Sequence, residues 1–562
     1  MKTITLAGVL TGSGLALVLG QMHSEAKPMF LVPPSNSCAT ATALSLGDHA
    51  FDTTSATVNL SVPSSSCSGA HTLYKSAYWS FTPPTTGNYV FSTCTGTSWD
   101  TRLVILNSCN TANGVVACND DACNYQSTVT ATLNAGTAYV VVVGGYGSGD
   151  AGAGTINGVS YMAYAIGTTS CNIGNAQLEW FASPDNRHPF IPMNMYRLKG
   201  GRLEQIGMSW GKHGFTALQG TLCGSCQASS TGNYLGIGCS DPYSSGLNGG
   251  QSGLGTRSEI NAHTGIFPGS YNVGMPPAPS TYGRRLAVKA SDLDPAQNAG
   301  ATYFVEGHYI HPQDAAANND NNNASYRQIT VGSLSSGAYT LTLTGATIQQ
   351  KAAIEAWKTS DATVTQSYAD ATGDGRFIVS SKARDLGNGQ WRYEYAVHNL
   401  NSHRSGRSFS VPVPAGATVT NVGFKDIDYH SGDPYAATDW TSSVSGGSVT
   451  WTGGDYAVSQ NGNALRFATL YNFWFDANVA PASANATIGL FRPGAAGEPN
   501  SVAAAVQAPG APSNPSDLND DGIVDGADLG ILLGGWGTNA ADLDGNGTTD
   551  GADLGILLGA WG

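Results

Sequence analysis

Charged side chains are scarce in this chain, and basic ones are the scarcer sign. Only 11% of the 562 residues are charged, and 39 acidic residues against 25 basic ones give a formal net charge of -14. Nucleic acids and anionic membrane surfaces recruit proteins through basic patches that displace counterions. The composition therefore argues against both as partners. Part of the acidic excess lies in C-terminal Asp clusters, where bound cations would offset it.

Long apolar runs are equally rare, and the longest lies near the N-terminus. Residues Ile4 to Gly20 follow Lys2 and precede Ser24-Glu25-Ala26, which has the small-x-small form of a signal-peptidase site. We expect residues 1–26 to be a signal peptide, with an uncleaved anchor as the alternative. No later stretch is long and apolar enough to span a bilayer, so the sequence predicts a secreted, extracellular or cell-surface protein without a membrane span after signal cleavage.

Cysteines are absent from the second half of the chain. All ten lie between Cys38 and Cys239. An even number in an exported chain predicts disulfides, whose pairing the sequence leaves open. The alternative is a zinc site at Cys223-Gly-Ser-Cys226, with Cys239 and a His as further ligands.

Familiar catalytic motifs are missing as well: there is no GxSxG elbow, no HExxH and no phosphate loop. The chain is instead rich in Gly, Thr, Ser, Val and Tyr, which favour short strands and turns. Its length predicts three or four units. We expect a mainly β fold of several β-sandwich modules, followed by a small all-α calcium-binding domain.

The first module is predicted over residues 30–167. Its apolar runs are bounded by Gly, Pro, Asn and Thr, a pattern typical of a small β-sandwich; the runs are Tyr78–Phe81, Tyr89–Ser92, Arg102–Leu106 and Ala138–Val143. The segments that begin at Asp100, at Val116 in Val-Ala-Cys-Asn-Asp-Asp121, and at Thr130 resemble the bacterial pre-peptidase C-terminal domain. That resemblance implies an accessory β-sandwich without catalysis.

Three further segments precede the tail. Residues 170–345 are irregular and β-rich, and they form the candidate functional domain. Residues 346–493 return to strand patterning, and we leave open whether they form one unit with the preceding region; the strand runs are Arg392–His398, Phe409–Pro414 and Ala464–Tyr471. Alternation in the first run places Tyr393, Tyr395 and Val397 on one face. Residues 494–515 are rich in Pro, Ala and Gly, which predicts a linker.

The tail, residues 516–562, contains a duplicated acidic block. The first copy fits a twelve-position EF-hand calcium loop with Gly522 at the turn, and its ligands are Asp517, Asn519, Asp521, the Ile523 carbonyl, Asp525 and Asp528. The second copy has Gly547 at the turn, and its ligands are Asp542, Asp544, Asn546, the Thr548 carbonyl, Asp550 and Asp553. Calcium prefers six or seven oxygens, and this spacing wraps them around one point. The sequence therefore predicts two Ca²⁺ ions; a solvated acidic tail or an RTX-like β-roll is the alternative.

Each loop is followed by Leu-Gly-Ile-Leu-Leu-Gly-x-Trp-Gly. Leu529, Leu532, Leu533 and Trp536 have the spacing of an amphipathic helix, and the second copy repeats it from Leu554. Paired loop-helix units of this kind resemble the type I dockerin. That family binds cohesin domains and often carries polysaccharide-degrading enzymes. Gly-Ala at positions 10 and 11 differs from the Ser/Thr-type pairs of the best-known members, which leaves the partner open between a cohesin-like and a cell-surface protein.

Candidate catalytic residues gather in the irregular region. On a strand, Glu306 and His308 would share a face, whereas His311 would point away. Support would come from distant residues, and the candidates are His213, Asp241, Glu259 and His263. Imidazoles that converge with a carboxylate suit copper or zinc, or an acid/base pair acting on a sugar. The alternative is that these side chains are structural.

A second polar patch comprises Asp426, Asp428, His430, Asp433 and Asp439. A structural turn or a calcium-stabilised loop explains it as well as catalysis does.

Three hypotheses follow for the whole chain. The first is a carbohydrate-active or carbohydrate-binding protein, which would be a hydrolase if an active site exists, positioned by a dockerin. The second is a non-catalytic adhesion component. The third is a copper or zinc enzyme centred on His213, His263 and His308.

Overall fold

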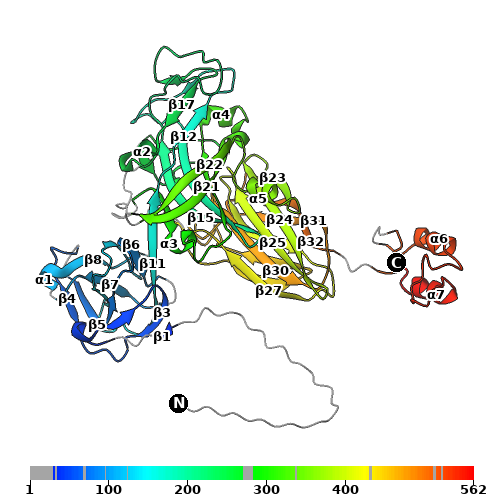
Figure 1. Cartoon of the computed structure of the whole chain (residues 1–562), viewed down its shortest axis with the longest axis horizontal. Helices are drawn as coiled ribbons and strands as arrows, with labels where there is room; N and C mark the ends of the chain where they lie inside the picture. The colour runs from blue at the N-terminus through cyan, green and yellow to red at the C-terminus, as the bar shows by residue number, and fades with distance from the viewer. Residues whose placement is uncertain are drawn as a thin grey trace, which may run out of the picture.

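The computed structural model describes residues 30–31, 35–67, 71–94, 97–109, 111–122, 125–269, 283–335, 338–428, 433–510, 514–519 and 523–562. The predicted signal peptide lies outside these ranges. Strands dominate the described residues, and helices are short connections or belong to the tail (Figure 1). The mainly β prediction is confirmed. None of the described helices has the length and apolar character needed to cross a bilayer.

The first module is a β-sandwich, as its alternating runs predict. One sheet comprises β2 Thr42–Leu44, β4 Leu60–Val62, β5 His71–Phe81, β7 Thr101–Leu106, β8 Val115–Asn119 and β10 Tyr139–Gly145. The facing strands are β1 Phe30–Leu31, β3 Gly47–Asp52, β6 Gly87–Ser92, β9 Thr128–Leu133 and the first half of β11 Ala153–Tyr164. Buried Trp79, Phe91, Leu103 and Val141 fill the space between them.

Strand β11 connects the first module to the middle region (Figure 1). Its first half pairs with β3 and β6, and its last residues, Tyr161 to Tyr164, pair with β19 Leu286–Lys289. Strand β19 pairs in turn with β15. One continuous sheet therefore runs through both regions, although the sequence suggests separate units.

Six strands form the rest of that sheet, and they are β14 Phe190–Lys199, β15 Arg202–His213, β18 Leu254–Gly255, β20 Thr302–His308, β21 Ala324–Ser335 and β22 Ala338–Ile348. Strands β14 and β15 form a hairpin whose turn is Gly200-Gly201, both with positive φ (60° and 85°). Directly paired residues share a face of a sheet. Because Glu306 pairs with Asn194, these two polar side chains lie on the same face.

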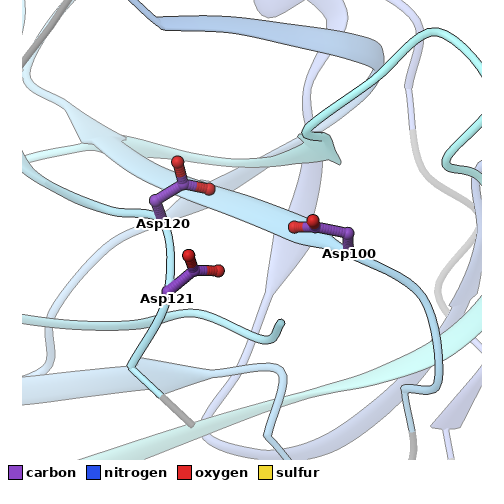
Figure 2. A group of neighbouring side chains, drawn as sticks. All are labelled: Asp100, Asp120 and Asp121. Atoms are coloured by element: carbon purple, nitrogen blue, oxygen red, sulfur yellow. The ribbon is translucent and has the colours of Figure 1, made fainter. Parts of the chain in front are cut away.

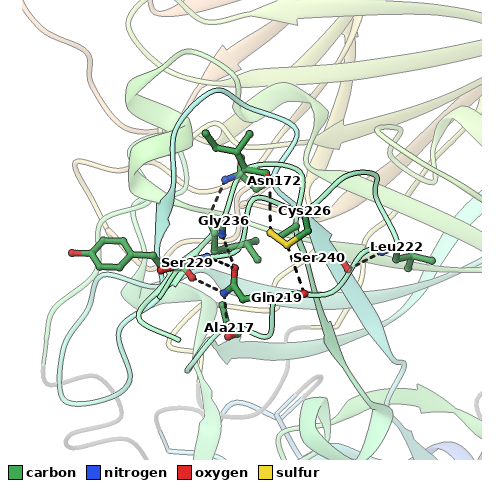
Figure 3. Close-up of a disulfide and its surroundings, with 12 residues drawn as sticks. Asn172, Ala217, Gln219, Leu222, Cys226, Ser229, Gly236 and Ser240 are labelled. Carbon is green, nitrogen blue, oxygen red and sulfur yellow. Dashed lines mark hydrogen bonds between the residues drawn. A yellow bond between two sulfur atoms is a disulfide. The ribbon is translucent and has the colours of Figure 1, made fainter. Parts of the chain in front are cut away.

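Two disulfides tie the irregular segment that follows β15. They join Cys171 to Cys223 and Cys226 to Cys239, which excludes the zinc alternative at these cysteines. The Gln219 carboxamide replaces missing sheet hydrogen bonds, since its oxygen accepts from the Gly236 and Ser229 amides and its NH₂ group donates to the Tyr234 carbonyl at 2.8 Å (Figure 3). Short elements make up this segment and its surroundings: β12 Thr168–Cys171 and β13 Leu178–Glu179 precede β14, and β16 Tyr234–Leu235, β17 Ser240–Tyr243, α2 Ser245–Asn248, η2 Gln251–Gly253 and η3 Arg257–Glu259 follow β15.

Disulfides also close the first module, where Cys38 bonds Cys109 and Cys67 bonds Cys118. Cys94 is disulfide-bonded too, and no described cysteine is free. The disulfide prediction is thereby confirmed, and it fits an oxidising, extracellular setting.

A second β-sandwich follows the helix α5 Glu355–Ser360. One sheet has β23 Thr365–Asp370, β24 Arg376–Gly387, β25 Gln390–Asn399, β27 Val419–Lys425 and β30 Leu470–Ala477. The other has β26 Gly406–Pro412, β28 Thr441–Ser445, β29 Ser448–Thr452, β31 Pro481–Leu490 and β32 Ser501–Pro509. Tyr393, Tyr395 and Val397 are all buried in the core between the sheets, so the predicted alternation is confirmed.

The linker prediction for residues 494–515 is wrong for its central part. Residues Ser501–Pro509 form β32, which pairs with β31 from Gly489↔Ser501 to Pro481↔Pro509. Small residues alternate inward along this strand, and Ala504, Val506 and Ala508 are buried in the sandwich core. The Pro, Ala and Gly content suggested a linker, but an Ala-rich segment can form a strand if its small residues alternate inward with a period of two. Larger side chains of the other strands then fill the core.

A second correction concerns Ala464–Tyr471, predicted as one strand. Strand β30 begins only at Leu470, and the preceding residues form a buried turn in which Ala468 has a φ of 54°. The Ala468 carbonyl accepts hydrogen bonds from Asn194, Gln205 and Arg257 at 3.3, 3.3 and 3.0 Å. The turn is therefore held by the neighbouring sheet, which local sequence does not reveal.

The tail consists of two loops, each leading into a helix, α6 Gly526–Gly534 and α7 Gly551–Gly559. Leu532 and Leu557 are fully buried between the helices. The predicted apolar stripe is only partly correct, because Leu533 and Leu558 are each 52% exposed and Trp536 and Trp561 each 47% exposed. Both tryptophans lie beyond the helix ends, so the helical spacing does not extend to them.

Candidate functional site

The second tail loop turns around the carboxylate of Asp542. Asp542, at position 1, accepts hydrogen bonds from the backbone amides of Gly545 and Asn546 through Oδ1 and from that of Gly547 through Oδ2. Gly547, at position 6, has a φ of 94°, which a side chain would oppose. The predicted role of this glycine is confirmed.

The position-12 aspartates close both loops. Asp553 is fully buried; its Oδ1 accepts from the amides of Leu543 and Asp544 at 2.6 and 3.1 Å, and its Oδ2 accepts from Asp550 at 2.7 Å. Asp528 makes the equivalent bonds in the first loop. These backbone hydrogen bonds, the one from Asp550 or Asp525 first, lower the pKa of each carboxyl and favour its ionised form.

Ligand oxygens in the second loop converge. One oxygen each of Asp542, Asp544 and Asp553 lies within 4.8 Å of the others. Asp550 caps α7 by accepting from the Ala552 amide, as Asp525 caps α6 by accepting from Ala527. In the first loop Asp517, Asn519 and Ile523 are described, and Asp521 lies outside the described residues. An all-oxygen, acidic set of this kind fits a hard cation such as Ca²⁺.

In the middle region, the predicted catalytic candidates divide into separate groups. Among the described residues, no three His, Cys, Asp or Glu side chains of this region bring ligand atoms within 4.8 Å of one another. His213, His263 and His308 therefore do not form the predicted copper or zinc centre among these residues.

The first group joins His213 to Glu259. The distance from His213 Nε2 to Glu259 Oε1 is 2.7 Å, and that from His213 Nδ1 to Nε2 of His188 is 3.1 Å. Nδ1 of His188 lies 2.8 Å from the Phe181 carbonyl. Burial lowers the pKa of His213 to about 3 and that of His188 to about 4, so both imidazoles favour their neutral form.

The second group is centred on Glu306, which is almost fully buried. Its Oε1 accepts from Asn194 at 2.8 Å and Tyr196 at 3.0 Å, and its Oε2 accepts from the Ala353 amide at 2.6 Å. Arg257 donates to the Asn194 carboxamide oxygen at 2.8 Å, so one amide links a buried cation to a buried anion. Every oxygen of Glu306 is used in holding the structure together.

Polar contacts around this network also join the middle region to the second sandwich. Gln205 of the first sheet accepts from the Leu470 amide at 2.8 Å, and Arg202 pairs with Glu394 at 2.6 Å across the same boundary. Buried polar groups stay paired because an unpaired one costs about 1–3 kcal/mol. Residues 170–345 and the second sandwich, which extends to residue 510, therefore pack as one unit.

His308 lies on the same face as Glu306 but without comparable partners. It is fully buried, as is His398 on β25, and no ring nitrogen of either makes a hydrogen bond with a described residue. Burial, together with the nearby His398 and Arg257, lowers the pKa of His308 to about 3. Burial lowers the pKa of His398 as well. Both imidazoles are neutral in the folded protein at physiological pH.

The remaining candidates lie elsewhere. Asp241 accepts from the Leu218 amide at 2.8 Å inside the disulfide-tied segment, and burial raises its pKa to about 6. His263 lies 3.9 Å from Asp320. Neither residue contacts the Glu306 group through a hydrogen bond between described residues. Strand β20 ends at His308, so the predicted alternation does not reach His311, which accepts from the Gln313 amide at the start of α4 Pro312–Ala316 and stacks on Trp180.

The Asp426 patch lines a small cleft of about 60 Å³ between β11, β19 and β27. Asp428 pairs with Lys289 at 2.6 Å and accepts from the Tyr161 hydroxyl at 3.1 Å. Burial raises the pKa of Asp426 to about 7, although Asn463 donates to it at 2.6 Å. His430 lies outside the described residues, Asp433 accepts from the Ser258 amide, and Asp439 is exposed. The ion pair with Lys289 fastens this loop to the first sheet.

Sequence reasoning missed an acidic cluster in the first module. Ligand oxygens of Asp100, Asp120 and Asp121 lie within 4.8 Å of one another (Figure 2). Burial, then Asp121, Asp120 and Asp150, raise the pKa of Asp100 to about 6. The signal was available, because Asp100 begins one of the three segments that carry the resemblance of this module, and Asp120 and Asp121 end another. Arg102 balances part of the charge by pairing with Asp120 at 3.1 Å.

Sequence reasoning also missed the buried networks of His188, Asn194 and Arg257, since nothing in the local sequence marks these residues as members.

Comparison with known proteins adds no assignment: no family model matches the chain, and no curated protein matches it.

Proposed function

We propose that this protein is a secreted modular component that attaches to a cohesin-like or cell-surface protein through a calcium-loaded tail, and that its β units bind or act on polysaccharide. The observation that carries the proposal is the duplication in the tail. Both units close a loop with a fully buried aspartate, Asp528 or Asp553, and both leave the same apolar side chains exposed.

The exposed side chains supply a docking surface. Ile531, Leu533 and Trp536 follow the first loop at 43%, 52% and 47% exposure, and the second copy repeats this pattern at Ile556, Leu558 and Trp561. Exposed aromatic and aliphatic anchors that recur in the same arrangement are typical of protein interfaces. Calcium supports the surface because each loop leads directly into the helix that carries these residues.

The polysaccharide part rests on the resemblance of the tail to dockerins, which often carry enzymes that degrade plant polysaccharides. The β-sandwich units suit a binding or accessory role. Since the described residues of the middle region bring no three metal-ligating side chains together, the copper or zinc hypothesis has the least support.

Calcium titration of the intact chain tests the tail. We expect the double variant Asp517→Ala, Asp542→Ala to lose two Ca²⁺ ions per chain relative to the wild type in isothermal titration calorimetry after chelation. Asp370→Ala is the matched control, because this aspartate pairs with Arg376 on the surface of the second sandwich. Equal calcium uptake by the double variant and the wild type would remove the basis of the proposal.

Docking has its own test. Full-length protein is passed over an immobilised type I cohesin domain, with Ca²⁺ or with EDTA. Calcium-dependent binding that disappears in Trp536→Ala, Trp561→Ala, and persists in a Tyr125→Ala control 66% exposed in the first module, supports a cohesin-like partner. Absence of calcium-dependent binding would rule that partner out.

A further inference from the structure

A groove lies on the outer side of the second sandwich, at the ends of β26, β29 and β31. Its volume is about 510 Å³, within the range of pockets that bind small ligands. The groove is much larger than the cleft beside Asp426 and is separate from the calcium loops and the buried histidines. Its lining combines an ion pair, hydroxyl groups, a carboxamide and two aromatic rings.

The charged pair in the groove is balanced. Arg407 donates to Asp455 at 3.2 Å, and the Ala457 amide donates to the other carboxylate oxygen at 2.9 Å. Both charged side chains keep about a third or more of their surface exposed, at 35% and 44%. Donors of the guanidinium and acceptors of the carboxylate therefore remain available side by side. The balance disfavours strongly charged ligands and suits one that carries neighbouring hydroxyl groups.

Hydroxyl groups form the floor. Ser408 and Thr452 are directly paired across β26 and β29, and their hydroxyls have no hydrogen-bond partner among the described residues. The neighbouring residue on β31 is Gly489, where a Cβ would lie 2.3 Å from the Ser408 hydroxyl oxygen. Glycine at this position keeps the floor open. The same cross-strand row continues to Thr441 on one side and Ser501 on the other, so the hydroxyl-bearing strip extends beyond the groove.

An aromatic wall and an amide complete the lining. The rings of Tyr456 and Phe491 meet edge to face, with centroids 5.3 Å apart, and the buried Phe491 fixes the partly exposed Tyr456. The Asn500 carboxamide oxygen accepts from Arg404 at 3.1 Å, which directs its NH₂ group away from that contact. Sugar rings offer both an apolar C–H face and a rim of hydroxyls, and this lining matches both.

We infer that this groove binds a neutral polysaccharide chain, with Tyr456 against a sugar ring and Arg407, Asp455 and Asn500 as hydrogen-bond partners of its hydroxyls. The inference rests on the polysaccharide part of the proposed function and gives it a site. The strip of hydroxyls on either side of the groove fits an elongated ligand better than a single sugar. Catalysis is not part of the inference, since the groove contains one carboxylate, Asp455.

The test uses the full chain and four neutral probes: cellohexaose, xylohexaose, laminarihexaose and mannohexaose. We expect at least one to bind in isothermal titration calorimetry, with affinity reduced about tenfold or more by Tyr456→Ala. Arg407→Ala is a second variant that leaves the aromatic wall in place and is expected to weaken the same probe. Tyr368→Ala is the matched control, because Tyr368 is 49% exposed on β23 of the opposite sheet.

Failure of all four probes to bind, or equal affinity in wild type, Tyr456→Ala and Arg407→Ala, would overturn the inference. Preference for an anionic oligogalacturonate over the neutral probes would overturn it as well. The outcome is separable from that of the tail. Binding in the groove is expected to persist in EDTA and in the Asp517→Ala, Asp542→Ala variant, whereas calcium uptake by the tail is not affected by Tyr456→Ala.

Discussion

Mild acid should loosen the contact between the first sheet and the second sandwich, because His308 and His398 are buried there as neutral imidazoles. Neither imidazole makes a hydrogen bond to a described residue, and Arg257 lies close enough to oppose a further positive charge. Glu306 favours protonation of His398, but its oxygens are already occupied by Asn194, Tyr196 and Ala353. Burial outweighs the favourable effects of Glu306 and of the Thr469 backbone on His398, so the pKa of both imidazoles stays below the ordinary value.

The size of the effect follows from the pKa of His308, about 3 when folded against an ordinary 6.5. A lowered folded pKa means that the unfolded chain binds the proton first. Stability from this group is then complete above pH 6.5 and is lost as the pH falls from 6.5 towards 3. Each pH unit corresponds to about 1.4 kcal/mol, so His308 alone accounts for about 2 kcal/mol between pH 6.5 and pH 5. His398 adds to the loss in the same direction.

Hydrogen exchange measured by mass spectrometry on the full chain isolates this contact. The relevant peptides cover β20 and β25, and the difference in opening free energy between pH 7.5 and pH 5 is the quantity compared. We expect His308→Leu to reduce that difference by about 2 kcal/mol. His263→Leu is the control, because the His263 side chain is 30% exposed. A difference in His308→Leu that equals that of the wild type would refute the reasoning.

Two further predictions concern packing. In the tail, Leu532→Ala should destabilise α6 by about 3 kcal/mol, because Leu532 is fully buried. Leu533→Ala should change stability by less than about 0.5 kcal/mol, because Leu533 is 52% exposed. Hydrogen-exchange protection of α6 in saturating Ca²⁺ measures both effects, and equal effects would contradict the assigned burial. At the contact between the first sheet and the second sandwich, Asn194→Leu should lower the free energy of unfolding by about 3 kcal/mol or more, since it leaves Arg257 and Glu306 without their shared amide. Urea unfolding followed by tryptophan fluorescence measures this loss, with the exposed Asn485→Leu as the control. A loss below about 1 kcal/mol would show that the amide link is dispensable.

Features set by neighbouring residues were predictable from the sequence. The strand alternation at Tyr393, Tyr395 and Val397 and the turn at Gly547 depend on spacings of a few residues. Such spacings fix geometry directly, through the two-residue period of a strand or the twelve-residue calcium loop. Disulfides in the N-terminal half could be predicted from the even number of cysteines and from the expected export of the chain.

Features that join distant segments could not be predicted from the sequence. Burial of Glu306 depends on Asn194 and Ala353, the turn at Ala468 depends on Arg257, and the Ala-rich β32 is a strand because β31 offers it a full edge. The groove likewise assembles Arg407, Tyr456 and Asn500 from separate strands and loops.

The sequence by itself determined a β-rich, disulfide-containing chain whose tail repeats an acidic loop followed by a helix. Only the tertiary structure decided that the middle region and second sandwich are one unit, that the candidate histidines are apart, and where a neutral groove opens. The reason is physical: local spacing sets backbone conformation, whereas burial and hydrogen-bond partners are set by which strands pack together.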